Sequence, residues 1–158
     1  MKRSNGQNKG QKETLNANPE ILRTQIGDGS EEEEIYKENI LDHYKKPRNF
    51  GRLDNADFVH KELNPLCGDS IEISLKVNKN KIKDIKFDGH GCAISRAAMS
   101  MLTEKIKGMN VEDVLNLNHD DIMNMLGIKI GVVRMKCALL SLKTLHNALN
   151  KVQSENEK

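Results

Sequence analysis

The fold is decided by SIEISLKV, residues Ser70–Val77. Apolar and polar side chains alternate along this stretch, which is the period of a β-strand with one buried face and one face in water. The turn-like residues 78–81 follow, and residues 82–87 return as a second strand. A slip in phase between Ile82 and Ile85 indicates a β-bulge. The sequence therefore predicts an antiparallel hairpin over residues 70–87.

A turn with a thiol and a carboxylate two residues apart comes directly before this hairpin: NPLCGD, Asn64–Asp69. Residues 57–63 precede the turn as a candidate first strand, although their alternation is unclear. After the hairpin, the sequence Gly-His-Gly at residues 89–91 ends the last strand. Cys92 then opens a helix that Gly108 closes.

Helices are predicted for the rest of the chain. Asn110 and Asn118 each have an aspartate three residues later, a pattern typical of a helix N-terminus, and these short helices end near Gly127. Apolar residues recur at helical spacing from Met135 to Val152 and predict a long last helix.

One more helix precedes the strands. Ser30 with Glu33 resembles a capping box, and Pro47 stops the helix after Tyr44. Residues 1–30 hold few apolar side chains, so we expect a disordered tail, followed by one domain over residues 31–152 and a frayed end at 153–158. The order of elements predicts an α+β fold, with a three-stranded antiparallel sheet packed against helices.

Composition excludes several classes of protein. The chain has 158 residues and a formal net charge of +2, and it lacks dense basic runs, which argues against a nucleic-acid binder. No apolar run approaches the roughly 20 residues of a membrane span, and the N-terminus lacks a signal-peptide core. We therefore expect a cytoplasmic protein, in which 3 cysteines point to metal binding, catalysis or burial rather than to disulfides.

The three cysteines are the candidate chemical groups. Cys67 shares a turn with Asp69, which places a hard oxygen close to a soft sulfur. Cys92 opens a helix, where free N–H groups favour a thiolate. We expect Cys137 in the first turn of the last helix, with Arg134 and Lys136 lowering its pKa. Three thiolates and one carboxylate would complete a four-ligand set for zinc or a [2Fe–2S] cluster.

Less specific interpretations stay open from the residues alone. The cysteines are not spaced as a C-x-x-C motif, so each could be a buried filler of the core. Asp69 alone could be an ordinary turn residue, and Lys136 a solvated helix charge. The five histidines are interpreted as ordinary structural residues, and the seven methionines as core packing.

Taken together, three segments resemble the NifU N-terminal/IscU/SufU family of iron–sulfur cluster assembly scaffolds: NPLCGD at 64–69, the residues from Phe87 to Ser95 around Cys92, and RMKCALL at 134–140. ILDHY at 40–44 and PRNFG at 47–51 are similar to the family's first helix and the loop after it. The resemblance covers about Glu34 to Asn150 and implies a small α+β fold with a three-stranded antiparallel sheet.

The resemblance implies a site and partners. Cys67, Cys92 and Cys137 match the family's ligand cysteines, and Asp69 matches the aspartate that keeps the cluster labile. The implied cargo is iron and a transient [2Fe–2S] cluster. The implied partners are a pyridoxal-phosphate cysteine desulfurase, which would deliver persulfide sulfur to one of the three thiols, and apo acceptor or carrier proteins.

The chain also departs from its family. Lys136 stands where the IscU branch has a histidine and resembles the SufU branch, where it would be a charge beside the sulfurs. SufU proteins usually carry an insertion between the second and third cysteines, and the interval from Cys92 to Cys137 is too short to contain it. The Leu-Pro-Pro-Val-Lys chaperone motif of IscU falls on residues 130–134, where both prolines are missing, so we expect no dedicated Hsp70-type chaperone.

Three functions remain after this comparison of residues. The first is a scaffold without enzymatic turnover, which binds iron, accepts sulfur and hands on a [2Fe–2S] cluster. The second is a zinc-dependent sulfurtransferase, in which the same four residues hold zinc and one thiolate leaves it to accept persulfide. The third is an adaptor that zinc merely stabilises.

Overall fold

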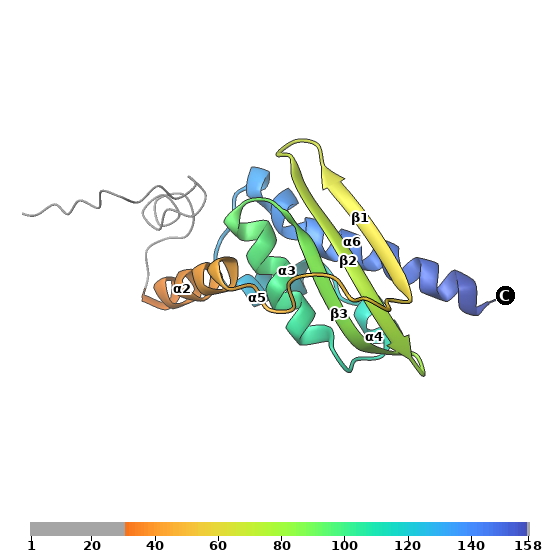
Figure 1. Cartoon of the computed structure of the whole chain (residues 1–158). Helices are drawn as coiled ribbons and strands as arrows, with labels where there is room; N and C mark the ends of the chain where they lie inside the picture. Colours follow the sequence, from red (N-terminus) through yellow and green to blue (C-terminus); the bar gives the residue numbers. More distant parts are fainter. Residues whose placement is uncertain (1–30, 158) are drawn as a thin grey trace, which may run out of the picture.

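The central strand of the sheet is β2, Asp69–Asn78, in a computed structural model that describes residues 31–157. It pairs with β1, Phe58–Asn64, on one side and with β3, Lys81–His90, on the other, and both pairings are antiparallel (Figure 1). The residues Ile71, Ile73 and Leu75 are fully buried, as their alternation predicts. The predicted α+β fold with a three-stranded antiparallel sheet is confirmed.

The bulge lies where the phase slip predicted it. Lys76 pairs with Asp84, and the next residue, Val77, pairs with Ile82, so that Lys83 is left over on β3. The extra residue returns Ile82 and Ile85 to the buried side of the sheet, where both are 0% exposed.

Helices cover one face of the sheet (Figure 1). α3, Ala93–Ile106, and α6, Val132–Asn156, pack against the strands, and α2, Glu31–Lys45, packs against α3. The short helices α4, Val111–Leu115, and α5, His119–Leu126, join α3 to α6. The core is filled by aliphatic and methionine side chains, which include Ile73, Leu75, Ile94, Met99, Leu102, Leu145 and Leu149.

The outer face of the sheet was expected to face water, but part of it is covered. The segment between α2 and β1 crosses it, and Figure 1 shows this loop passing over β3 on its way to β1. Its Leu53 N–H donates to the hydroxyl of Ser74, at 3.0 Å, and Ser74 is only 3% exposed. The alternation of residues 70–77 predicted the side on which Ser74 lies, but it could not predict a covering loop.

The same loop closes the outer edge of β3. The Gly51 N–H donates to the Phe87 carbonyl at 2.8 Å, and the Phe87 N–H donates to the Asn49 carbonyl at 2.9 Å. The rings of Phe50 and Phe87 meet edge to face, with centroids 5.2 Å apart. Three residues of loop thus behave as a short extra strand, which satisfies backbone groups that an edge strand otherwise exposes.

Helix ends follow the sequence in most places. Asn118 forms the predicted capping box, because its side chain accepts from the Asp120 and Asp121 N–H groups while Asp121 accepts from its N–H. Asn110 begins α4 but does not cap it, since its amide bonds the Asp113 carboxylate instead.

α6 is helical through Asn156, four residues beyond Val152, and its last turns contain neither glycine nor proline. The predicted tail at residues 1–30 and the capping role of Ser30 lie outside the described residues. None of the described helices is both long and apolar enough to cross a membrane.

Candidate metal centre

The first functional group is presented by the tip of the β1–β2 hairpin. Asn64 pairs with Asp69 across the hairpin, and residues 65–68 form the turn between them. The Asn64 carbonyl accepts N–H groups from Cys67 and Gly68, and its side-chain oxygen accepts the Leu66 N–H at 3.2 Å. Gly68 has a φ of 76°, a left-handed conformation that glycine adopts without strain. The turn leaves Cys67 exposed to solvent.

Asp69 begins β2 and points inward from the same turn. Its residue is 3% exposed, and its Oδ1 accepts the backbone N–H of Cys92 at 3.2 Å. Its Oδ2 is buried and has no hydrogen-bond partner within the described part of the chain. A buried carboxylate oxygen without a donor is costly, so this oxygen is available to a bound cation.

Gly91 makes this approach of the carboxylate possible. A Cβ atom at Gly91 would lie 2.9 Å from Asp69 Oδ1 and 2.4 Å from the hydroxyl of Ser95. Any other residue would therefore push the carboxylate away from the Cys92 N–H. The Gly-Cys sequence at residues 91–92 is thus required by space as well as by the helix start.

Cys92 is the N-cap residue of α3, and 5% of it is exposed. The Ser95 hydroxyl donates to its carbonyl at 3.2 Å and lies 3.9 Å from its sulfur. The helix start and the Asp69 carboxylate together fix the backbone of Cys92, and its thiol interacts with that of Cys137.

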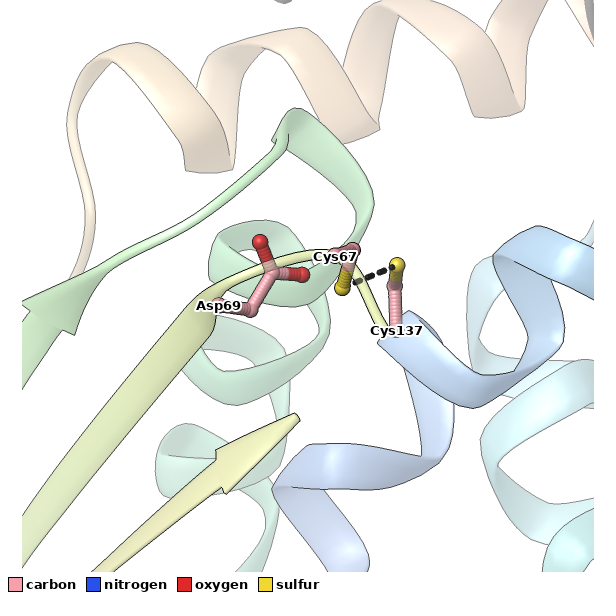
Figure 2. Close-up of side chains that lie close together, drawn as sticks. All are labelled: Cys67, Asp69 and Cys137. Carbon is pink, nitrogen blue, oxygen red and sulfur yellow. Dashed lines mark hydrogen bonds between the residues drawn. The ribbon is translucent and has the colours of Figure 1, made fainter. Parts of the chain in front are cut away.

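The remaining thiol comes from α6. Cys137 is 2% exposed, and its Sγ lies 3.3 Å from the Sγ of Cys67. Figure 2 shows the two sulfurs pointing toward one another, with a carboxylate oxygen of Asp69 on the same side. One ligand atom from each of Cys67, Asp69 and Cys137 lies within 4.8 Å of the others. Cys92 is not in this group of three, but its thiol interacts with Cys137.

The two buried thiols are coupled through one proton. A hydrogen bond from Cys137, together with the Ser95 backbone N–H and the charge of Arg134, lowers the pKa of Cys92 to about 6, against burial and the charge of Asp69. The same hydrogen bond, followed by burial, raises the pKa of Cys137. Of the two buried thiols, Cys92 is therefore the more acidic.

This result corrects the expectation for Cys137. α6 begins at Val132, after Gly131 as N-cap, so Cys137 lies one turn inside the helix and not in its first turn. Its pKa is raised rather than lowered, and the charge of Arg134 acts on Cys92 instead. Lys136 is exposed and lines an open groove beside the site.

The donor set suits a soft metal. In a tetrahedral zinc site with bonds of about 2.3 Å, neighbouring sulfurs lie about 3.8 Å apart, slightly farther than the 3.3 Å between Cys67 and Cys137. Cys67 lies in a short turn, where a small shift would open that distance. One carboxylate oxygen of Asp69 lies within 4.8 Å of both sulfurs and is a further candidate ligand atom. These residues fit zinc or an iron–sulfur cluster, with Cys92 as the fourth candidate ligand.

Exposed apolar side chains lie at the hairpin tip and at the start of α6. Leu63 is 59% exposed and Leu66 is 74% exposed, and both line a groove of about 350 Å³ between the hairpin tip and α6. Val132 and Val133, at the start of α6, are each 78% exposed. Such a concentration of apolar surface is typical of a contact region for another protein.

Three residues that shape the site were not singled out as such from the sequence. Asn64 holds the turn, Gly91 provides space for Asp69, and Ser95 bonds the backbone of Cys92. A signal existed only for Asn64, because asparagine at the first position of a turn commonly accepts a backbone N–H. The histidines behave as interpreted: for example, His43 bonds Ser100 at 2.7 Å, and His146 bonds the Val114 carbonyl.

Known proteins similar to this chain share both its sequence and its fold. An iron–sulfur cluster assembly scaffold protein, IscU 1 of Archaeoglobus fulgidus, is 38% identical over 115 residues, covering 73% of this chain and 74% of that protein. The zinc-dependent sulfurtransferase SufU of Bacillus subtilis is 35% identical over 139 residues, covering 77% of this chain and 94% of SufU.

A solved structure gives the same result. FiSufU of Fervidobacterium islandicum AW-1 superposes with a TM-score of 0.61 at 32% identity and covers 73% of this chain and 97% of that structure. The family model of the NifU-like N terminal domain matches residues 35–158. The match includes all three cysteines and Asp69, and the chain belongs to the NifU-like N-terminal domain family, in which the IscU and SufU proteins are its relatives.

Proposed function

We propose that this protein is a scaffold on which an iron–sulfur cluster is assembled and from which it is passed on. Cys67, Asp69, Cys92 and Cys137 bind iron, sulfur arrives as persulfide, and a [2Fe–2S] cluster forms between these side chains. The cluster is cargo, so the protein is not an enzyme in the usual sense. The cytoplasm stays the predicted location.

One observation supports this proposal above the others. Ligand atoms of Cys67, Asp69 and Cys137 lie within 4.8 Å of each other, and the Oδ2 atom of Asp69 is buried without a partner. A site that served only for stability would not require an unpaired buried oxygen. A bound cation would satisfy that oxygen and explain why it is retained.

The position of the site also suits cargo that must leave. Cys67 is exposed at a hairpin tip, whereas Cys92 and Cys137 are held in helices. Oxygen is a harder and weaker ligand for iron than thiolate, so Asp69 makes one side of the site easier to open. Lys136 directly precedes Cys137 in the sequence, and its positive charge would offset part of the negative charge of the cluster.

The proposed partners are a pyridoxal-phosphate cysteine desulfurase and apo acceptor or carrier proteins. A desulfurase must bring a persulfide to an accessible thiol, and Cys67 is exposed. The exposed residues Leu63 and Leu66 lie next to it and offer apolar contact area.

The test is anaerobic reconstitution with ferrous iron and inorganic sulfide, followed by visible absorption. The wild type should develop sulfide-to-iron charge-transfer bands, and both Cys67→Ser and Cys137→Ser should lose them. Leu66→Ser and Ala138→Ser are matched controls from the same turn and helix, and they should keep the bands. A wild type without bands, or a Cys67→Ser variant with normal bands, would contradict the scaffold function.

A zinc-dependent sulfurtransferase is the second candidate function. Lys136 directly before Cys137, together with the similarity to SufU over 94% of that protein, favours it. The same four residues would hold zinc, which keeps thiolates deprotonated at neutral pH. Metal analysis after purification without air separates the two functions: stoichiometric zinc with stimulation of desulfurase turnover favours the sulfurtransferase, and iron with labile sulfide favours the scaffold.

A further inference from the structure

The three thiols differ sharply in access. Cys67 is exposed, whereas Cys92 is 5% exposed and Cys137 is 2% exposed. A sulfur donor on another protein cannot reach a thiol in the core without opening the helices. Persulfide sulfur brought from outside therefore meets Cys67 first.

The nearest thiol to that first acceptor is also defined by the fold. The Cys137 Sγ lies 3.3 Å from the Cys67 Sγ, within the range of about 3–3.5 Å from which reacting atoms can begin an attack. In a persulfide on Cys67, this Sγ is the inner sulfur, so the closest electrophilic atom to Cys137 is the inner and not the outer sulfur. A disulfide needs about 2.05 Å between sulfurs, a closure of about 1.3 Å.

The two thiols are mounted so that this closure is possible. Cys137 is fixed within α6, whereas Cys67 lies in the turn of residues 65–68. The turn is held by backbone bonds to Asn64 of 2.8 and 3.3 Å, and Cys67 itself makes only the longer one. The exposed thiol can therefore move toward the fixed one without disturbing the sheet.

We propose that, in the metal-free protein, Cys137 resolves a persulfide on Cys67 and releases sulfide. This inference rests on the proposed function, because it assumes that persulfide sulfur reaches Cys67. The Cys137 thiol gives up its proton along its hydrogen bond to Cys92 as its sulfur bonds to Cys67 Sγ, and the bond between Cys67 Sγ and the outer sulfur breaks. The outer sulfur leaves as hydrosulfide, and the proton of the Cys137 thiol stays on Cys92.

The electrons balance within the protein. The outer sulfur enters at the oxidation level of elemental sulfur and gains two electrons to become sulfide, which is the level that an iron–sulfur cluster contains. The two cysteine thiols lose those two electrons and become a Cys67–Cys137 disulfide. A dithiol reductant must then restore both thiols before the next metal ion binds.

Metal occupancy should control the step. Zinc or iron bound to both thiolates occupies the electron pairs that the attack requires, so the loaded protein should hold sulfur without closing the disulfide. The reaction is therefore a property of the metal-free site, in which the two sulfurs already lie in contact.

The experiment uses the full chain, reduced, freed of metal with a chelator and then treated anaerobically with one equivalent of inorganic polysulfide. Released sulfide is measured with time, and samples are alkylated for intact mass and peptide mapping. The wild type should release about one sulfide per chain and contain a Cys67–Cys137 cross-link. Cys137→Ser should retain one extra sulfur atom on Cys67 and release sulfide at least tenfold more slowly.

Controls decide between this step and its alternatives. Ala138→Ser, which puts a hydroxyl at the neighbouring buried position, should release sulfide like the wild type, and zinc-loaded wild type should release it at least tenfold more slowly. An extra sulfur found on Cys137 without a disulfide, a disulfide to Cys92, or rapid release from Cys137→Ser would each overturn the proposal.

Failure here is separable from failure of the scaffold function. Reconstitution with ferrous iron and inorganic sulfide supplies sulfur that is already reduced, so it does not need the disulfide step. Bands in that assay combined with no cross-link from polysulfide would reject this inference and leave the scaffold function standing. A cross-link without any cluster formation would do the reverse.

Discussion

The two ends of β2 are both hairpin turns, but they are completed in different ways. At the far end, Lys79 and Asn80 adopt left-handed conformations, and the Asn80 carbonyl accepts the Val111 N–H at 2.9 Å, so the turn is tied to α4. At the site end, Cys67 is exposed and the Oδ2 of Asp69 has no partner in the described chain. The far turn is tied to a helix, whereas the site turn carries an exposed thiol and ends at a buried carboxylate oxygen that is unpaired in the described chain.

This difference indicates that the far turn serves mainly the stability of the domain and that the site turn serves mainly metal binding. Contacts of the far turn should contribute to the free energy of unfolding without affecting metal. Contacts of the site turn should affect metal binding more than they affect the fold. Matched substitutions at the two ends test this division.

The largest effect is expected from Gly91→Ala. The new Cβ would lie 2.9 Å from Asp69 Oδ1 and would displace the carboxylate, so zinc affinity should fall by about 10- to 100-fold. Gly108→Ala is the control, since φ is 87° there and no atom lies within 4 Å of the new Cβ. It should cost roughly 1–2 kcal/mol of folding stability through backbone strain and leave zinc affinity unchanged. Competition with a chromogenic chelator measures both, and equal affinities in the two variants would contradict the assignment.

Next in size is the effect of Asp69 on the stability of the metal-free protein. Asp69→Asn keeps an oxygen that accepts the Cys92 N–H and removes a buried unpaired charge, so stability in urea should rise by about 1 kcal/mol. Asp69→Ala loses the acceptor at the start of α3 and should lower stability by about 1 kcal/mol. Both variants should bind metal more weakly. A fall in stability for Asp69→Asn would mean that the carboxylate is retained for folding.

A pair of asparagines compares the turns directly. Asn64→Ala removes the oxygen that accepts the Leu66 N–H, and Asn80→Ala places a less tolerant residue at a φ of 62°. Each should cost about 1 kcal/mol in thermal unfolding. Only Asn64→Ala should also weaken zinc binding, by several-fold, because it loosens the turn that carries Cys67. Weaker zinc binding by Asn80→Ala would contradict the conclusion that the far turn does not affect metal binding.

The smallest effect concerns the pH dependence at the far end. Burial raises the pKa of Asp84. Hydrogen bonds from Lys107 and from the Ile85 N–H outweigh burial and lower this pKa below its ordinary value of 3.8. The ionised carboxylate therefore stabilises the fold above pH 3.8, and this contribution is lost as the pH falls through the lowered pKa. At pH 7, the free energy of unfolding of Asp84→Asn should be lower than that of the wild type by less than about 1 kcal/mol. This difference in stability should disappear by about pH 2.5. A difference that persists in acid would exclude this cause.

Local patterns predicted those parts of the fold that are stabilised locally. The alternation of residues 70–77, the phase slip before Ile85 and the capping box at Asn118 each depend on neighbours in the sequence, and the structure confirms all three. The loop that pairs with Phe87 could not be predicted, because its hydrogen bonds join residues almost forty positions apart. The burial of Ser74 follows from that loop and was missed with it.

The same limit applies to the site. The residue types of Cys67, Asp69, Cys92 and Cys137 indicated metal chemistry, but spacing alone left several alternatives. Sequence could not show that Cys137 lies within contact of Cys67, or that Cys92 and Cys137 share a proton. α6 begins after Gly131, about one turn earlier than expected. The charge of Arg134 lowers the pKa of Cys92 rather than that of Cys137.

The loop segment Asn49–Gly51 affects how readily copies of the protein can associate through the edges of their sheets. It occupies the outer edge of β3, and the bridge between Lys81 and Asn110 occupies the start of the same strand. Chains stacking edge to edge would therefore have to add at β1, where the exposed ammonium group of Lys61 stands at mid-strand and repels its own copy. The one edge of the sheet that stays open among the described residues therefore carries its own protection against self-association.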